Sequence, residues 1–291
     1  TKTMRWSNQG VRFARPVHWI LALFGIDVLP VAFGDISSGR VTFGNRFMAR
    51  EPLEVADPET YEQVLDKAHV IPDLDKRKHA IWSTLENEAK KLGAEIRDRD
   101  LLDEVANLLE YPHPIIGTFD EDYLTVPSEV LVTVMKHHQR YFPMYVSGDR
   151  SKLKACFGAF SNIVPKDDAV VRAGNERVLK ARLDDGRYFF VEDLKVPLAV
   201  YADRLRDVIF HKDLGTSWEK VQRFSQVALA LAERIAPEKK DKVKEAASLC
   251  KADLNSLMVC ELPELQGIMG KEYALRQGID PEVAVAIREH Y

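Results

Sequence analysis

The chain has 291 residues, of which 46% are hydrophobic and 30% charged, and its formal net charge is −4. This composition is typical of a soluble protein with a buried core, and it excludes intrinsic disorder and collagen-like repetition. The most apolar stretch, residues 17–34, is interrupted by Gly25, Asp27 and Pro30, so the sequence predicts no membrane span.

Three cysteines without CxxC spacing predict neither a disulfide framework nor a zinc site, and they favour the cytoplasm as location. The sequence contains no pattern typical of a signal peptide. It begins with Thr1 and ends at Tyr291 within a predicted helix, so we expect an interior piece of a longer protein.

The first fifty residues predict β-strands. Apolar runs at His18–Phe24 and Val28–Phe33 are separated by the turn residues Gly25-Ile26-Asp27. A third segment, Arg40–Phe47, alternates in character.

Three helices are predicted next. The first runs from Pro58 to about residue 70. The second begins after Asp73, a suitable N-cap, and ends before Gly93, which suits the position after a helix. The third covers residues 101–109 and is stopped by Pro112.

Mixed structure follows from residue 114. We expect a strand at residues 115–119, a helix capped by Ser128 that continues to Arg140, and a hairpin formed by residues 141–146 and 153–160. From residue 167 the pattern is almost entirely helical, with segments at 171–190, 197–209, 218–235, 242–262, 264–276 and 282–291. The sequence therefore predicts an α+β half with a mixed sheet, residues 1–180, followed by an all-α domain, residues 181–291.

Motifs for catalysis are missing from the sequence. Neither GxGxxG nor GxxxxGK[ST] occurs, and the eight histidines form no HExxH pair. An HD-type hydrolase needs a His-Asp dyad whose side chains hold a divalent ion. The helical half offers His211 and then Ala252-Asp253, with alanine where the dyad needs histidine. We therefore expect no catalytic residue and no metal site.

The charges are unevenly distributed. Residues 1–50 carry a net charge of +5, residues 51–129 carry −12, residues 130–182 carry +6 and residues 183–291 carry −3. Guanidinium groups match phosphate oxygens, and aromatic faces stack on unpaired bases. The predicted phosphate contacts are Arg5, Arg12, Arg15, Lys136, Arg140, Arg177, Lys180 and Arg182, and the predicted base-stacking residues are Trp19, His138 and Tyr141. The alternative is that each cation pairs with a carboxylate of the acidic block.

Several strings resemble, in order, the beta subunit family of the bacterial heterotetrameric glycyl-tRNA synthetase. They include RFARPVHW, EYPHPIIGTFDEDYLTVPSEVL, HHQRYFPM, GNERVLKARLDDGRYFFVED and KADLNSLMVCELPELQGIMGKEYA. The resemblance implies an enzyme of two alpha and two beta chains that uses ATP to join glycine to its tRNA. The alpha chain would hold the active site, and this piece of the beta chain would handle tRNA without a cofactor of its own.

The resemblance also implies an editing-type tRNA-handling domain in the first half and an HD-like helical domain, truncated at its C-terminus, in the second. Two alternatives stay open. One is a metal-dependent HD-type phosphohydrolase or editing hydrolase with His211 and Asp253 as ligands. The other is a module that mainly docks other subunits through the acidic helices of residues 51–129.

Overall fold

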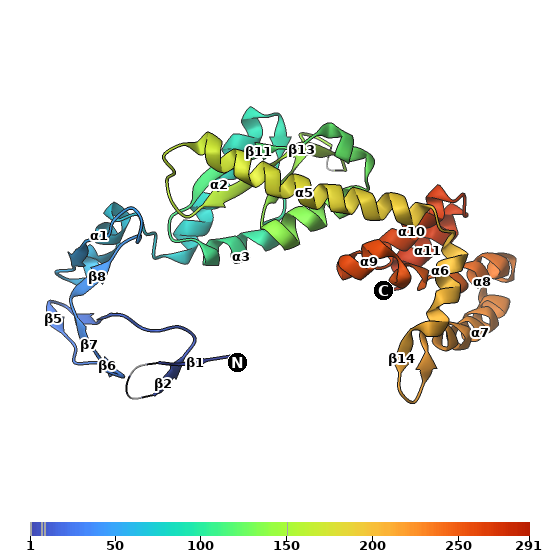
Figure 1. Ribbon diagram of the computed structural model, residues 1–291, viewed down its shortest axis with the longest axis horizontal. Helices are drawn as coiled ribbons and strands as arrows, with labels where there is room; N and C mark the ends of the chain where they lie inside the picture. Colours follow the sequence, from blue (N-terminus) through green and yellow to red (C-terminus); the bar gives the residue numbers. More distant parts are fainter. Residues whose placement is uncertain (1, 7, 9, 150) are drawn as a thin grey trace. The chain divides into compact units, whose positions relative to one another are not determined.

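The computed structural model describes residues 2–6, 8, 10–149 and 151–291. The chain divides into two compact units, Thr1–Ile116 with Gly158–Arg172, and Gly117–Phe157 with Ala173–Tyr291 (Figure 1). The predicted domain division after residue 180 lies inside one long helix and stays a prediction. Within the described residues, no helix combines the length and apolarity that crossing a bilayer requires.

Short strands make up the N-terminal part of the first unit. Their bounds are β1 Met4–Trp6, β2 Val11–Phe13, β3 Ile20–Leu21, β4 Leu23–Phe24, β5 Asp27–Val28, β6 Ala32–Phe33, β7 Ile36–Gly39, β8 Val41–Phe43 and β9 Pro52–Glu54. β1 pairs with β2 and β8 with β9, both antiparallel, whereas β3 runs parallel to β7. The predicted strands are thus present but shorter than expected.

The segment after β8 explains one such shortening. The predicted strand Arg40–Phe47 ends at Phe43, and the chain then packs closely on Ala68. A Cβ on Gly44 would lie 2.5 Å from the Cβ of Ala68, and the Asn45 side chain donates to the carbonyl oxygen of Asn162 at 2.9 Å. Residues 44 and 45 thus make tertiary contacts in place of hydrogen bonds to a neighbouring strand.

The helices of the first unit follow the predictions. They are η1 Pro58–Thr60, α1 Tyr61–Lys67, α2 Leu74–Lys91 and α3 Arg99–Leu108, with a short strand, β10 Ala94–Glu95, between the last two. The Asp73 carboxylate accepts the backbone N–H of Lys76 at 2.8 Å, and Gly93 has φ +63°. Both predicted ends of α2 are therefore confirmed.

The central segment contains β11 His113–Thr118, η2 Glu121–Thr125, α4 Ser128–Thr133, η3 Val134–Gln139, β12 Phe142–Val146 and β13 Leu153–Ser161. The predicted hairpin is confirmed, with Gly148 at φ +79° in its turn. The predicted cap is wrong, because Pro127 occupies the N-cap position and the Ser128 hydroxyl donates to Glu129 instead. The expected single helix also changes to a π-helix at η3, and Arg140 ends it with φ +60°.

The C-terminal part is helical (Figure 1). Its elements are α5 Asp168–Leu194, α6 Leu198–Arg204, η4 Leu205–Asp207, β14 Ile209–His211, β15 Gly215–Thr216, α7 Ser217–Ile235, η5 Pro237–Lys239, α8 Lys240–Leu249, η6 Ala252–Asn255, α9 Leu257–Glu261, η7 Pro263–Leu265, α10 Ile268–Arg276 and α11 Pro281–Glu289. The predicted order, mixed structure before a helical portion, is confirmed. The expectation of an all-α second domain is wrong at the β14–β15 hairpin.

A buried carboxylate organises these helices. Asp193 of α5 has no exposed surface and accepts four hydrogen bonds. The donors are the hydroxyls of Tyr201 at 2.8 Å and Tyr273 at 2.7 Å, and the backbone N–H groups of Leu257 at 2.8 Å and Met258 at 2.9 Å. A buried charge needs such partners. Because Asp193 holds the first N–H groups of α9, the chain breaks between α8 and α9, and the predicted helix over 242–262 is wrong.

Candidate nucleic-acid interface

The β1–β2 ribbon presents two faces of opposite character. Side chains alternate along a strand, so Trp6 and Phe13 lie on one face. Their ring centroids both lie 5.8 Å from that of Phe33. Arg5 and Arg12 are direct cross-strand partners and lie on the other face. The aromatic contacts therefore hold the ribbon, and its second face carries a pair of arginines.

The charges of this ribbon are not compensated. Among the described residues, Arg5, Arg12 and the nearby Arg15 make no ion pair with any carboxylate. Like charges directly opposite one another in a ladder repel. The alternative reading, in which each cation is neutralised by the acidic block, is therefore not realised at these three positions.

Trp19 is held by two neighbouring residues and is partly exposed. Its indole N–H donates to the hydroxyl of Thr42 at 3.2 Å, and its ring centroid lies 4.8 Å from that of Phe43. The residue is still 43% exposed. Such a fixed, half-open ring is suited to stacking on an unpaired base.

The π-helix η3 carries two of the predicted residues, Lys136 and His138, and a third, Arg140, follows it as the C-cap. The Arg140 guanidinium donates to the carbonyl oxygens of Lys136 and His137 at the end of η3. Tyr141 follows directly and is only 9% exposed, with its ring stacked on Phe157 at 4.7 Å. Since that ring face is already stacked on Phe157, Tyr141 does not offer it to a base.

Along α5, the predicted cations differ in their partners. Lys180 contacts Asp184 at 2.7 Å, and Arg182 lies 3.8 Å from Asp185. The hydrogen bond from Lys180 holds the pKa of the Asp184 carboxyl below its usual value. Arg177, one turn before Lys180, makes no ion pair within the described part of the chain. Exposed ion pairs contribute little stability, so these lysine and arginine side chains can exchange partners readily.

The sequence did not predict one cluster of interacting side chains, which forms between α5 and Tyr123. The Tyr123 hydroxyl donates to Asp184 at 2.5 Å, and the Arg187 guanidinium lies 4.8 Å above the Tyr123 ring and 3.2 Å from Asp184. The spacing of Asp184 and Arg187 signals a helical pair, but the contribution of Tyr123 depends on tertiary packing.

Two of the predicted residues meet at a small depression. His138 of η3 and Arg182 of α5 line a cavity of about 20 Å³, together with Asp185 and Glu261. The structure therefore brings together Arg5 with Arg12 in one unit, and His138 with Arg182 in the other.

The residues considered for metal chemistry are arranged differently. His211 lies exposed on β14, whereas Asp253 is completely buried. One Asp253 oxygen accepts the backbone N–H groups of Gly267 at 2.5 Å and Gly270 at 3.0 Å, where α10 begins. Across the described residues, His, Cys, Asp and Glu side chains form no group of three that would hold a metal ion. Asp253 thus serves as a structural contact to α10.

Comparison with known proteins gives a consistent result. The family described as glycyl-tRNA synthetase beta subunit matches residues 1–291. The chain is 50% identical over its whole length to the glycine–tRNA ligase beta subunits of Geobacter sulfurreducens and Geotalea daltonii, and 47% identical to that of Syntrophotalea carbinolica. It covers 42% of each of these proteins.

These matches point to a subunit of an aminoacyl-tRNA synthetase. The chain belongs to the glycyl-tRNA synthetase beta subunit family, which confirms the resemblance seen in its sequence. It spans about two fifths of the length of the curated relatives it matches.

Proposed function

We propose that this chain is the tRNA-handling part of a glycyl-tRNA synthetase beta subunit in the cytoplasm. In this proposal the alpha subunit, in an assembly of two alpha and two beta chains, uses ATP to attach glycine to its tRNA. The chain itself supplies RNA contacts and no active site. The names of its relatives and the match over all 291 residues support this role.

The observation that carries the proposal is the β1–β2 ribbon. Arg5 and Arg12 face each other without a carboxylate partner in the described part of the chain. A phosphate between two guanidinium groups removes their repulsion and accepts charge-assisted hydrogen bonds. Arg15 and the half-open ring of Trp19 follow within the same segment, and they suit a backbone with unpaired bases.

A second set of proposed contacts lies on η3, at the residue directly after it, and on α5. It consists of Lys136, His138, Arg140, Arg177, Lys180 and Arg182. Because the ion pairs of Lys180 and Arg182 are exposed, a phosphate can replace their carboxylate partners at small cost. We further propose that the first half corresponds to an editing-type tRNA-handling domain and the helical half to an HD-like domain without hydrolytic function.

The experiment measures the affinity of the assembled enzyme for glycine tRNA over a range of salt concentrations. The double variant Arg5→Gln/Arg12→Gln removes two phosphate contacts. Each contact contributes about 0.7 to 0.9 to the slope of log affinity against log salt, so the slope should decrease by roughly 1.4 to 1.8.

The matched control is Lys76→Gln/Lys78→Gln, which also removes two positive charges. Both lysines lie on α2 and already have carboxylate partners, Glu62 for Lys76 and Asp103 for Lys78. The control should leave the slope nearly unchanged. Equal slopes for the wild type and the ribbon variant would overturn the proposal and favour the subunit-docking alternative, which crosslinking in the assembled enzyme then tests.

A further inference from the structure

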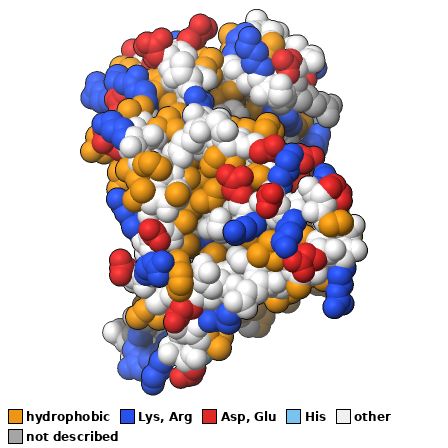
Figure 2. Space-filling view, turned by 90° about the vertical axis from the view of Figure 1, so that its right-hand side faces the viewer, with side chains coloured by type: hydrophobic (Ala, Val, Ile, Leu, Met, Phe, Trp, Pro, Cys, Tyr) orange, Lys and Arg blue, Asp and Glu red, His pale blue; other side chains and the backbone are white. Residues whose placement is uncertain are grey.

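Helices α7, α8 and α11 enclose a groove of about 860 Å³. Figure 2, which views the molecule from the side of these helices, shows hydrophobic side chains exposed among charged ones. The groove is lined mainly by apolar residues, among them Phe224, Val243, Ala246, Val283, Val285 and Ala286. Its size and apolar lining match those of sites for small organic ligands.

One end of the groove carries uncompensated positive charge. Lys220 and Lys251 line this end, and neither forms an ion pair in the described part of the chain. Their ammonium groups lie over aromatic rings instead, Lys220 at 3.8 Å from the Phe210 centroid and Lys251 at 3.5 Å from that of Tyr291. Burial lowers the pKa of Lys251, and repulsion from Lys220 adds to that effect.

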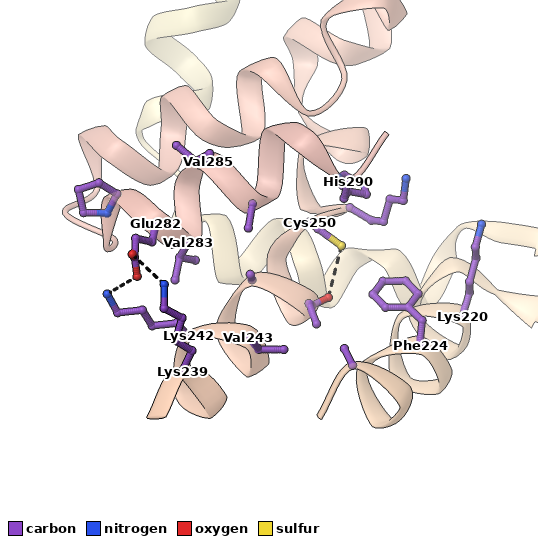
Figure 3. Close-up of a pocket in the computed structure, with 16 residues that line it drawn as sticks. Lys220, Phe224, Lys239, Lys242, Val243, Cys250, Glu282, Val283, Val285 and His290 are labelled. Atoms are coloured by element: carbon purple, nitrogen blue, oxygen red, sulfur yellow. Dashed lines mark hydrogen bonds and ion pairs between the residues drawn. The ribbon is translucent and has the colours of Figure 1, made fainter. Parts of the chain in front are cut away.

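A histidine with an unused nitrogen lies at the same end (Figure 3). The Nδ1 atom of His290 is 2.6 Å from the carbonyl oxygen of Ile287, so it donates its hydrogen there. The Nε2 atom is buried and finds no hydrogen-bond partner within the described residues. Burial and the charges of Lys251 and Lys220 lower the pKa of His290, which keeps the ring neutral and Nε2 an acceptor.

The opposite end of the groove is neutralised. Lys239 and Lys242 contact Glu282 at 3.1 Å and 2.8 Å (Figure 3). Lys242 also lies 2.9 Å from Asp280. The groove is therefore asymmetric, because among the described residues only the end with Lys220 and Lys251 has cations without carboxylate partners.

We propose that this groove binds a small organic phosphate with a flat aromatic body, of the nucleoside monophosphate type. The phosphate pairs with Lys220 and Lys251, since a dianion compensates two ammonium groups. The aromatic body lies along Phe224 and the valine and alanine side chains, and a hydroxyl or amino group of the ligand donates to Nε2 of His290. This site is distinct from the tRNA contacts proposed above.

The test uses the full-length beta subunit in complex with its alpha chain and AMP as the probe, measured by calorimetry. An anionic fluorescent dye, anilinonaphthalene sulfonate, reports occupancy of the groove and should be displaced by AMP. The variant Lys220→Gln/Lys251→Gln should lose at least tenfold in AMP affinity. The variant Ala286→Trp, which fills the groove from an exposed position of α11, should abolish the dye signal displaced by AMP, so that any AMP it still binds lies outside the groove.

The control Lys239→Gln/Lys242→Gln removes the same charge at the neutralised end and should change the AMP affinity less than twofold. Equal losses in both double variants would overturn the proposal, as would AMP that neither binds at millimolar concentration nor displaces the dye. Adenosine binding as tightly as AMP would refute the role of the lysines, and inorganic phosphate binding as tightly would refute the role of the apolar lining. Since the alpha chain uses ATP in the proposed function, the same titration is repeated on Ala286→Trp to subtract AMP bound outside the groove.

Discussion

Asp253 provides a direct test of how the helical part is stabilised. Its side chain is 0% exposed, and one carboxylate oxygen accepts two backbone N–H groups at the start of α10, while the other has no partner among the described residues. Burial is the main effect and raises the pKa of Asp253 from 3.8 to about 6, although the two N–H groups act in the opposite direction. The folded protein therefore holds a carboxylate that resists ionisation.

The sign and size of the effect on stability follow from this pKa. Between about pH 4 and pH 6 the folded state binds the proton more tightly than the unfolded chain does. The stabilising contribution is complete below the unfolded pKa and is lost as the pH rises through about 6. At about 1.4 kcal/mol per pKa unit, the loss amounts to roughly 3 kcal/mol.

The variant Asp253→Asn keeps a carbonyl oxygen for the two N–H groups and cannot ionise. Its amide introduces an unpaired donor, but that cost does not vary with pH. We therefore expect the free energy of unfolding of the variant, relative to wild type, to increase by about 3 kcal/mol between pH 3 and pH 7.5. Urea unfolding followed by circular dichroism at several pH values measures this difference.

A control of opposite sign is Asp184→Asn. The hydrogen bond from Lys180 lowers the pKa of Asp184, so its contribution is present above the unfolded pKa and is lost as the pH falls. The relative stability of this variant should thus change in the other direction. A difference between Asp253→Asn and wild type that stays constant over the whole pH range would refute the buried-carboxylate reasoning.

Two further predictions concern packing. Asp193→Ala should destabilise the helical part by about 3 to 5 kcal/mol, because it leaves two tyrosine hydroxyls and two backbone N–H groups without their acceptor. Tyr273→Phe removes only one of these four hydrogen bonds and should cost about 1 kcal/mol. Thermal unfolding compares the two variants, and similar losses of stability would contradict the arrangement of four hydrogen bonds. Gly117→Ala places a Cβ 2.4 Å from the Phe157 ring and should destabilise the protein by about 1 to 3 kcal/mol. Gly174→Ala, whose Cβ meets open space on α5, should stabilise it by up to about 1 kcal/mol. If the urea midpoints of the two variants had the reverse order, the Phe157 ring would be shown to move aside freely.

Local signals account for the elements that the sequence predicts well. Asp73 and Gly93 determine the ends of α2 through contacts within one turn, and Gly148 allows the turn between β12 and β13. The break between α8 and α9 depends on Asp193, which is more than sixty residues away in the chain. No periodicity within residues 242–262 contains that information, so a continuous helix was the natural prediction.

The same distinction applies to the candidate interface. A window of sequence identifies cations and aromatic residues, but the β1–β2 register decides that Arg5 faces Arg12, and contact with Phe157 decides that the Tyr141 ring is covered. The depression shared by His138 and Arg182 likewise arises only when η3 and α5 pack together.

The two basic blocks of the sequence therefore differ in a way that net charge does not reveal. In the first, Arg5 and Arg12 are direct cross-strand partners, and a bound phosphate would supply an ion pair that neither makes among the described residues. In the second, a phosphate would have to replace the existing carboxylate partners of Lys180 and Arg182, so the net gain would be smaller. If both blocks contact tRNA, the arginines of the ribbon should contribute more to affinity than the cations of α5, even though the second block carries the larger net charge.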